Sequence, residues 1–191
     1  MKKLWMGLIA AASMQAAMAD PAGQVRGLVG LGLTVGGDTI GTVNYNNGTS
    51  SDLTAGGTVD LRGGLEYWLQ GQPVALELSM GYHTDRVSAN NGDATFTRFP
   101  LELIAHYALS PQLRVGVGAR KSLNTKLDVS IDNGEHTKFK SSVGGIAEVE
   151  YFFTPQFSLK GRYVVERFTS DDAYKDKLEG DHLGVYGMLY F

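Results

Sequence analysis

The sequence predicts an all-β fold, namely a closed eight-stranded antiparallel up-and-down transmembrane β-barrel. Three observations indicate this fold: segments in which apolar and polar residues alternate, a regular succession of long and short connections between them, and the absence of cysteine. After the first nineteen residues, no segment combines helical periodicity with caps and no run of 18 apolar residues occurs. A helical membrane protein is therefore excluded. The 191 residues are enough for one domain.

The first nineteen residues have the three parts of a secretory signal peptide. Lys2 and Lys3 give a positive start, residues 4–12 are apolar, and residues 17–19 read Ala-Met-Ala, a small-x-small cleavage site. The apolar part is too short for a good membrane helix, and an uncleaved anchor is the alternative. We expect a signal peptide over 1–19 and a β-barrel domain over 20–191.

The net charge and the absence of cysteine further restrict the class of protein to which the chain can belong. Removal of the two N-terminal lysines changes the formal charge from −3 to −5, which is mildly acidic and implies no nucleic-acid partner. An exported protein without cysteine has no disulfides to stabilise it. A sheet that closes on itself in a bilayer is another route to stability, because every backbone polar group then finds a partner.

Eight segments alternate in character, and most are close to the 9–11 residues that a tilted strand needs to cross a bilayer. They cover about 24–34, 57–68, 74–84, 96–109, 113–123, 139–153, 157–168 and 182–191. Long polar connections cover about 35–56, 85–95, 124–138 and 169–181. Short connections cover 69–73, 110–112 and 154–156. Long and short connections alternate strictly, which is typical of a barrel with long outer loops and tight periplasmic turns.

Two of the long connections have features of their own. The first contains many Asn, Ser and Thr residues between 44 and 51, and we expect it to be mobile. The third has Asp132, Asn133 and Gly134 at its tip, residues that favour left-handed backbone angles. We expect this third hairpin to extend beyond the membrane, with Leu127, Val129 and Ile131 continuing the alternation.

Each segment has one apolar face and one face that carries charge. In 74–84, for example, Leu76 and Leu78 share one face, while Glu77 and His83 share the other. The charged faces together hold seven acids and six bases: Asp60, Glu66, Glu77, Glu102, Glu148, Glu150, Glu166, Arg26, Arg62, Arg114, Arg120, Lys160 and Arg162. Unpaired buried charge costs several kcal/mol, so near balance is expected of charges that fill a narrow interior.

These thirteen residues therefore predict an ionic network packed inside the barrel. The interior of an eight-stranded barrel is just wide enough for such side chains. Two alternatives remain open. The charges line a conduit, or they face water outside a soluble lipocalin-like barrel that binds an apolar ligand within.

The C-terminal segment, His182 to Phe191, ends on phenylalanine with Leu183, Val185 and Leu189 in step. It resembles the final strand of bacterial outer-membrane barrels, which the barrel assembly machinery reads, and this resemblance implies that Phe191 is the assembly signal. Together with the signal peptide and the loop pattern, the whole mature chain resembles the OmpA/OmpX-like group of small eight-stranded barrels. The resemblance implies a place in the bacterial outer membrane, in contact with its lipid and lipopolysaccharide. The chain ends at the last strand, so the peptidoglycan-binding domain of full OmpA proteins is not expected, and no loop motif indicates an adhesin of the OmpX or Ail type.

The first functional hypothesis is a non-enzymatic surface protein whose loops contact lipopolysaccharide or a host or matrix ligand. Lys121, Lys126, Lys138 and Lys140 are expected near the outer rim of the third hairpin, where they either pair with lipid phosphates or form a solvated rim. The second hypothesis is a narrow porin-like channel for ions or small solutes.

The third hypothesis is an enzyme that edits lipid A with His and Ser on its membrane-facing surface. None of the four histidines has a serine two positions on, and His83 with Asp85 is the one candidate pair. We expect no enzyme activity, no catalytic residues and no cofactor. The acidic residues of the fourth long connection lack the defined spacing of a divalent-ion site, so no metal is expected either.

Overall fold

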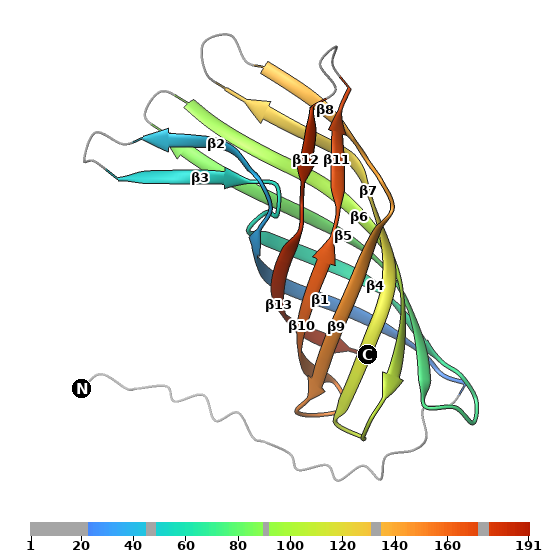
Figure 1. Ribbon diagram of the computed structural model, residues 1–191. Helices are drawn as coiled ribbons and strands as arrows, with labels where there is room; N and C mark the ends of the chain where they lie inside the picture. Colours follow the sequence, from blue (N-terminus) through green and yellow to red (C-terminus); the bar gives the residue numbers. More distant parts are fainter. Residues whose placement is uncertain (1–22, 45–48, 90–91, 131–134, 172–175) are drawn as a thin grey trace, which may run out of the picture.

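The computed structural model describes residues 23–44, 49–89, 92–130, 135–171 and 176–191, and the expected signal peptide at 1–19 lies outside these ranges (Figure 1). The described residues form thirteen strands. They are β1 (Val25–Gly36), β2 (Thr39–Asn44), β3 (Ser50–Thr54), β4 (Val59–Trp68), β5 (Val74–Ala89), β6 (Gly92–Ala108), β7 (Leu113–Val129), β8 (Glu135–Ser141), β9 (Gly144–Phe152), β10 (Phe157–Val165), β11 (Arg167–Ser170), β12 (Lys177–Glu179) and β13 (His182–Tyr190). No helix among the described residues is long and apolar enough to cross a bilayer.

Eight of these strands close into a ring. Each of β1, β4, β5, β6, β7, β9, β10 and β13 pairs antiparallel with the next, and β13 pairs back with β1 from Leu28↔Tyr190 to Gly36↔His182. The ring leaves no free sheet edge within its paired length, which is the condition for strands to span a bilayer. The predicted fold, a closed eight-stranded antiparallel barrel, is confirmed.

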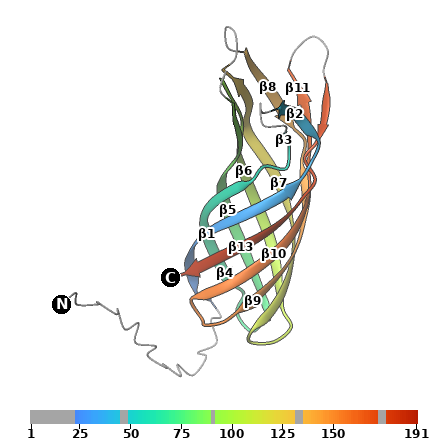
Figure 2. The ribbon, with the colours of Figure 1, turned by 90° about the vertical axis from the view of Figure 1, so that its left-hand side faces the viewer.

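Of the remaining strands, β8, β11 and β12 extend the barrel wall at the end that carries the long connections, and β2 and β3 form a separate two-stranded sheet there (Figure 2). We call this the loop end, and the opposite end the turn end. β5, β6 and β7 continue past the predicted segment ends, while the predicted segments 139–153 and 157–168 each divide into two strands. The extension of β7 to Val129 agrees with the expectation that the third hairpin continues beyond the membrane. The extensions of β5 and β6 were not predicted, because their expected lengths were those needed to cross a bilayer.

The first long connection, expected to be mobile, contains an ordered hairpin. β2 and β3 pair from Thr39↔Thr54 to Asn44↔Ser50, and the Ala55 amide donates to the Asp38 carbonyl at 2.8 Å. The hairpin contacts β5 and β6 rather than standing alone. Its residues 45–48 lie outside the described ranges, as does Ile131 of the third hairpin.

A β-bulge in β7 reverses which residues face inward. Phe99 of β6 pairs with Leu123, but Thr97 pairs with Lys126, so β7 has one extra residue at this point. Asn124 occupies the bulge with a φ of 49°, in the left-handed region that Asn tolerates better than most residues. The alternation does continue to Leu127, but the bulge moves its apolar residues from the outward to the inward face.

The inward residues of the extended wall form what we call the outer apolar core. Its buried members are Leu53, Ala55, Val87, Phe96 and Phe168, with Leu127, Phe139 and Leu178 packed around them. The Phe96 ring meets Phe139 and Phe168 edge-on, with centroids 5.7 and 5.6 Å apart. All four long connections or their flanking strands contribute to this core, so the loop end is a packed structure.

At membrane height the polarity is opposite. Leu33, Leu103 and Val117 face outward and are 65%, 57% and 66% exposed, whereas Glu77 and Lys160 face inward and have no exposed surface. Aromatic contacts flank this band, with Tyr82–Phe99 near the loop end and Tyr151–Phe153 near the turn end. Such a belt matches the height at which amphipathic rings meet the lipid interface.

Candidate functional site

The candidate site is the barrel interior, where the structure brings all thirteen predicted charged residues together. Twelve of them are buried, and the Arg26 side chain is 20% exposed at the turn end. They come from β1, β4, β5, β6, β7, β9 and β10 and from Glu166, which follows β10. We call this set the interior ionic network.

At the turn end, Glu66 and Glu150 organise the network. Arg26 Nη2 lies 2.5 Å from Glu66 Oε1, and the Trp68 indole donates to the same oxygen at 2.7 Å. Arg114 donates to the other Glu66 oxygen and to Glu150 Oε2, the latter at 2.8 Å. Each carboxylate thus receives several donors, which is the condition under which buried charge is tolerated.

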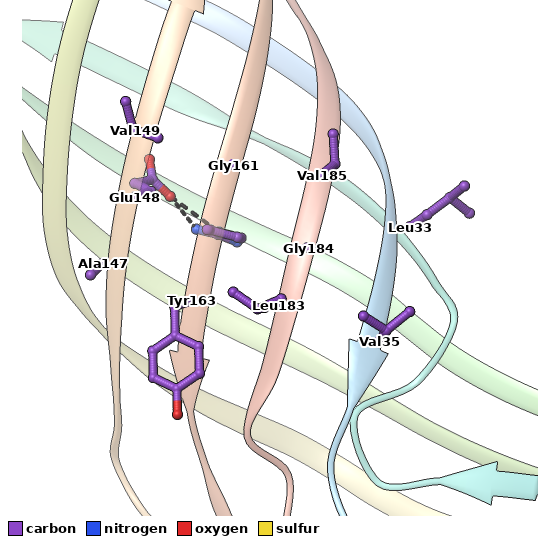
Figure 3. A pocket seen from close by; sticks show the side chains of 11 residues that line it. Leu33, Val35, Ala147, Glu148, Val149, Gly161, Tyr163, Leu183, Gly184 and Val185 are labelled. Carbon is purple, nitrogen blue, oxygen red and sulfur yellow. Dashed lines mark hydrogen bonds and ion pairs between the residues drawn. The ribbon is translucent and has the colours of Figure 1, made fainter.

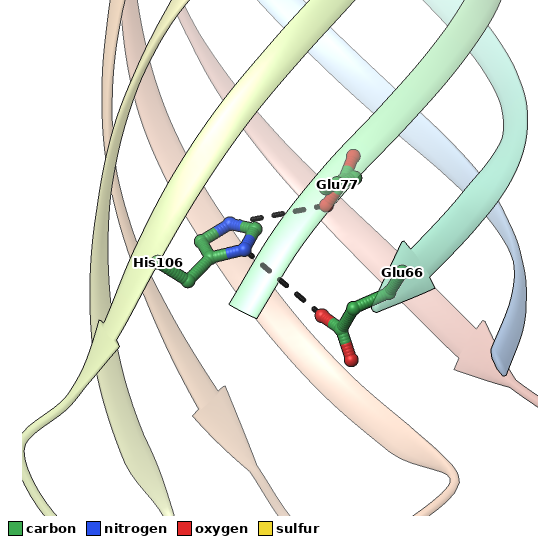
Figure 4. A group of neighbouring side chains, drawn as sticks. All are labelled: Glu66, Glu77 and His106. Atoms are coloured by element: carbon green, nitrogen blue, oxygen red, sulfur yellow. Dashed lines mark ion pairs between the residues drawn. The ribbon is translucent and has the colours of Figure 1, made fainter. Parts of the chain in front are cut away.

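In the middle of the barrel, Lys160 and His106 share the glutamates. Lys160 Nζ lies 2.9 Å from both Glu77 Oε2 and Glu148 Oε1. His106 Nε2 lies 2.6 Å from Glu148 Oε1 and 3.8 Å from Glu77 Oε2, and its Nδ1 lies 4.0 Å from Glu66 (Figure 4). The cross-barrel contacts join strands that are not neighbours in the wall, so the side chains fill the interior.

Towards the loop end, three arginines converge on Glu102. Arg62 Nη1 lies 2.5 Å from Glu102 Oε2, and Arg120 and Arg162 each lie 3.0 Å from this carboxylate. Arg162 also reaches Glu148 at 2.6 Å and so connects the two halves of the network. Asp60 pairs with Arg62 at 2.6 Å, and Glu166 pairs with Arg120 at 3.1 Å.

Where the ionic network meets the outer apolar core, polar side chains hold the segment that follows β3. Asp85 accepts hydrogen bonds from the Thr54 amide at 2.8 Å and the Thr58 hydroxyl at 2.6 Å. Arg98 donates to the Gly56 carbonyl at 2.9 Å, and its guanidinium lies over the ring of Phe168. The base of the first long connection is thereby fixed across the barrel mouth.

His83 and Asp85, the candidate catalytic pair, both point into the barrel and do not bond to each other in the contacts the structure gives. His83 Nδ1 lies 3.1 Å from Arg120 Nη2, and Nε2 lies 2.9 Å from the Thr34 hydroxyl. His83 Nε2 also lies 3.4 Å from Arg98 Nη2, so an arginine faces each of the two ring nitrogens. Neither side chain reaches the membrane-facing surface where an enzyme acting on lipid would need it.

Two groups of described residues have the composition of a metal site. Glu66, Glu77 and His106 form one, and His106, Glu148 and Glu150 form the other, each with ligand atoms within 4.8 Å of one another (Figure 4). The carboxylates of these groups already form ion pairs with Lys160 and Arg114, which neutralise their charge. We therefore assign these groups to the interior ionic network.

One groove of the described surface lies on the outward, lipid-facing side (Figure 3). Its volume is about 790 Å³, and β9, β10, β13 and β1 line it with Ala147, Val149, Tyr163, Leu183 and Val35 among others. It exists because Gly161 faces outward without a side chain, and a Cβ there would meet only Val149 Cγ1, at 3.8 Å. Apart from the inward ion pair of Glu148 and Arg162 behind it, its lining is apolar.

The thirteen predicted residues were an incomplete set. Arg98 and Asp85 are also buried with the network and raise it to eight acids and seven bases among the described residues. Strand period two already placed Arg98 on the face of Glu102, so this signal was available. Tyr186 and Tyr190 donate to Asp60 at 2.9 Å and to Glu150 at 2.6 Å. Period two also placed both tyrosines on the face opposite Leu183, Val185 and Leu189, but it did not indicate these hydrogen bonds, because tyrosine suits either face.

The fold and its charged interior define a small transmembrane β-barrel. The sequence matches the family model of the outer membrane protein beta-barrel domain over residues 6–185, and the chain belongs to this family. It is therefore an integral barrel of the bacterial outer membrane. No curated protein matches the sequence.

Solved structures agree with the fold. One is Neisserial surface protein A, at 13% identity and a TM-score of 0.51, with 87% of this chain and 96% of that chain covered. Another is Ail, the attachment invasion locus protein of Yersinia pestis, solved with the heparin analogue sucrose octasulfate. It is 10% identical with a TM-score of 0.56, and 88% of this chain and 98% of that chain are covered. The resemblance to the small outer-membrane barrels is confirmed.

Proposed function

We propose that this chain is a closed, non-enzymatic outer-membrane barrel that holds its outer hairpins as a binding surface for envelope or host molecules. The observation that carries this proposal is the barrel interior, which side chains fill from the turn end to the loop end. The interior ionic network occupies membrane height, and the outer apolar core lies above it. A structure filled in this way is suited to support a surface rather than to pass solutes.

A channel would need a continuous wet path along the network, and burial argues against one. Asp60, Glu66, Glu77, Arg98, Lys160 and Glu166 have no surface accessible to a water molecule. Each cation lies within ion-pair distance of at least one interior carboxylate, so a mobile ion would have to displace an existing partner. Above this layer, the rings of Phe96 and Phe168 form a further apolar barrier.

An enzyme of the lipid-editing kind would need reactive groups on the membrane face. His83, His106 and His182 are buried in the interior, and His136 on β8 pairs with Asp128 at 2.7 Å. Among the described residues, none of the four hydrogen-bonds to a serine hydroxyl in the contacts the structure gives. This distribution supports a non-enzymatic role.

The wall at the loop end supports surface presentation. β5 to β8 extend beyond the membrane band, and their outward residues are polar, such as Arg86 and Lys126. The solved complex of Ail with a heparin analogue is a precedent for ligand binding by a barrel of this fold, so a host or matrix ligand belongs to the proposal. Lipopolysaccharide is the proposed partner within the envelope.

Export and assembly complete the proposal. We propose that the signal peptide is cleaved after residue 19 and that the barrel assembly machinery reads the last strand. Phe191 is 75% exposed, its backbone exchanges hydrogen bonds with Gly27 at 2.7 and 3.0 Å, and its ring lies over Gly27. N-terminal sequencing of the mature protein tests the first part, and a start other than Asp20 contradicts it.

Planar-bilayer conductance of the purified mature barrel tests the closed state. We expect no resolved channel currents, because solutes have no wet path through the interior. Heat-modifiable migration of the same preparation shows that the barrel is folded, and discrete single-channel currents would establish the porin-like alternative. Mass spectrometry of lipid A from cells with and without the gene tests enzyme activity, and a mass difference would overturn the non-enzymatic assignment.

A further inference from the structure

Four lysines share the outward face of the third hairpin. They are Lys121 and Lys126 on β7 and Lys138 and Lys140 on β8, and we call them the lysine ladder. Lys126 and Lys138 are directly opposite each other in the strand pairing. Lys121 and Lys126 differ by an odd number of residues, and they face the same side only because of the bulge at Asn124.

The charges of the lysine ladder are only partly neutralised. Lys126 Nζ lies 2.8 Å from Asp128, and Lys140 Nζ lies 2.6 Å from Asp171. Asp128 also holds His136 at 2.7 Å. Among the described residues, Lys121 and Lys138 have no carboxylate within 4.0 Å. Like charges placed opposite each other across two strands repel, so the ladder is suited to an anion between its members.

The height of the ladder matches the headgroup layer of the outer leaflet. Lys121 is the next outward residue after Ala119, which is exposed in the apolar band. Two residues further along β7, Leu123 pairs with Phe99, whose ring contacts Tyr82 at the loop-end edge of the band. A strand advances about 3.3 Å per residue and is tilted by about 40° from the bilayer normal, so Lys126 lies about 13 Å above Lys121 along that normal. The lysines thus begin at the edge of the hydrocarbon and end above it.

The apolar groove lies beneath the ladder on the same side of the wall. Groove-lining Ala147 pairs with Val117, and Gly145 pairs with Ala119, so small outward residues connect the groove to Lys121. The four residues from Val117 to Lys121 span about 14 Å along the strand. Beyond the loop-end side of groove-lining β10, Arg167 on β11 is neutralised by Asp181 and by Glu179 at 3.3 Å. An anion is therefore drawn to the β7–β8 side.

We propose that this surface binds one phosphorylated, acylated lipid of the outer leaflet, of the lipid A class. The phosphates lie on the lysine ladder, between Lys121, Lys138 and their neighbours, and one acyl chain lies along Gly145 and Ala147 into the groove at Gly161. This site rests on the proposed function in one respect only, that lipopolysaccharide is the envelope partner of the barrel.

Native mass spectrometry of the mature barrel, released from detergent with purified lipid A, tests the site. We expect one tightly bound lipid A, and about tenfold weaker binding of a dephosphorylated lipid A, since charge-assisted hydrogen bonds to phosphate are lost. Inorganic phosphate should compete poorly, because it lacks the acyl chain. Equal binding of the dephosphorylated lipid, or complete competition by inorganic phosphate, would overturn the proposal.

Paired variants separate the two parts of the site. Lys121→Gln with Lys138→Gln should weaken lipid A about tenfold, and Lys177→Gln, which removes an exposed lysine on β12, should leave it unchanged. Gly161→Leu fills the groove and should weaken the acylated lipid severalfold. Gly63→Leu is its matched control, because Gly63 also faces outward, has only the Leu28 carbonyl oxygen within 4 Å, and lies on a strand that does not line the groove. Equal effects of target and control variants would contradict the site.

A heparin fragment is the remaining probe. If it binds at the lysine ladder more tightly than lipid A, the lipid assignment is wrong while the surface-binding function stands. If channel currents appear while lipid A binds as expected, the closed state is wrong and the lipid site stands. The two proposals therefore fail separately.

Discussion

The interior ionic network and the outer apolar core occupy the same cylinder but obey opposite rules of polarity. β5 shows the change within one uninterrupted strand. At membrane height Leu76, Leu78 and Tyr82 face outward and Glu77 faces inward, while beyond it Arg86 faces outward and Val87 inward. In lipid the outer surface must be apolar, so the polar residues face the lumen, whereas in water the ordinary arrangement returns.

The two regions also differ in what their contacts tolerate. In the interior ionic network each buried charge depends on its partner, because removal of one partner leaves the other charge buried and unpaired. The apolar core loses only packing and buried area when a side chain is shortened. The network should therefore control the stability of the whole barrel, and the apolar core should control the order of the hairpins above it.

The largest effect is expected for Glu102→Gln. This change leaves the guanidinium groups of Arg62, Arg120 and Arg162 crowded around a neutral amide, and we expect a loss of about 3–5 kcal/mol in the free energy of unfolding. Urea unfolding of the barrel in lipid vesicles, followed by Trp68 fluorescence, measures it. Glu179→Gln, which removes an exposed partner of Arg167, is the control, and equal losses for the two variants would show that the interior pairs are not special.

A smaller and more local effect is expected for Phe168→Ala. Shortening a buried Phe to Ala costs about 3–5 kcal/mol in the free energy of unfolding when the protein unfolds as one cooperative unit. Because Phe168 lies above the membrane band, we expect the loss mainly in the amides of β2 and β3. Hydrogen exchange should show faster exchange there, with β9 and β10 unchanged. If Phe168→Ala lowers the global unfolding free energy as much as Glu102→Gln, the two regions form one cooperative unit.

Much of this division could be predicted from the sequence at membrane height and little above it. Period two placed Glu102 and Lys160 on inward faces because lipid and lumen impose a simple alternation. The outer apolar core escaped prediction because its members come from seven separate strands or the residues next to them, and because the bulge at Asn124 decides that Leu127 faces inward. An asparagine in a polar stretch does not reveal that it adopts a φ of 49°. The ordered β2–β3 hairpin was missed for the same reason, since its anchors at Asp85 and Arg98 are distant in sequence.

The smallest effect is expected for the exposed ion pair of Lys126 and Asp128 on the lysine ladder, which we compare with the buried pairs of the interior ionic network. The hydrogen bond from Lys126 lowers the pKa of Asp128 below the ordinary Asp value, and His136 contributes to the same direction. Because the folded-state pKa is depressed, the ionised carboxylate stabilises the fold above the ordinary pKa, and this contribution is lost as the pH falls through the folded-state pKa. The pair is exposed, so solvent and salt screen it.

A carboxyl NMR titration should show the Asp128 pKa returning towards its ordinary value in Lys126→Gln and in 0.5 M salt, whereas salt should leave the instability of Glu102→Gln unchanged. An Asp128 pKa that responds to neither change would show that this pair, too, behaves as a buried one.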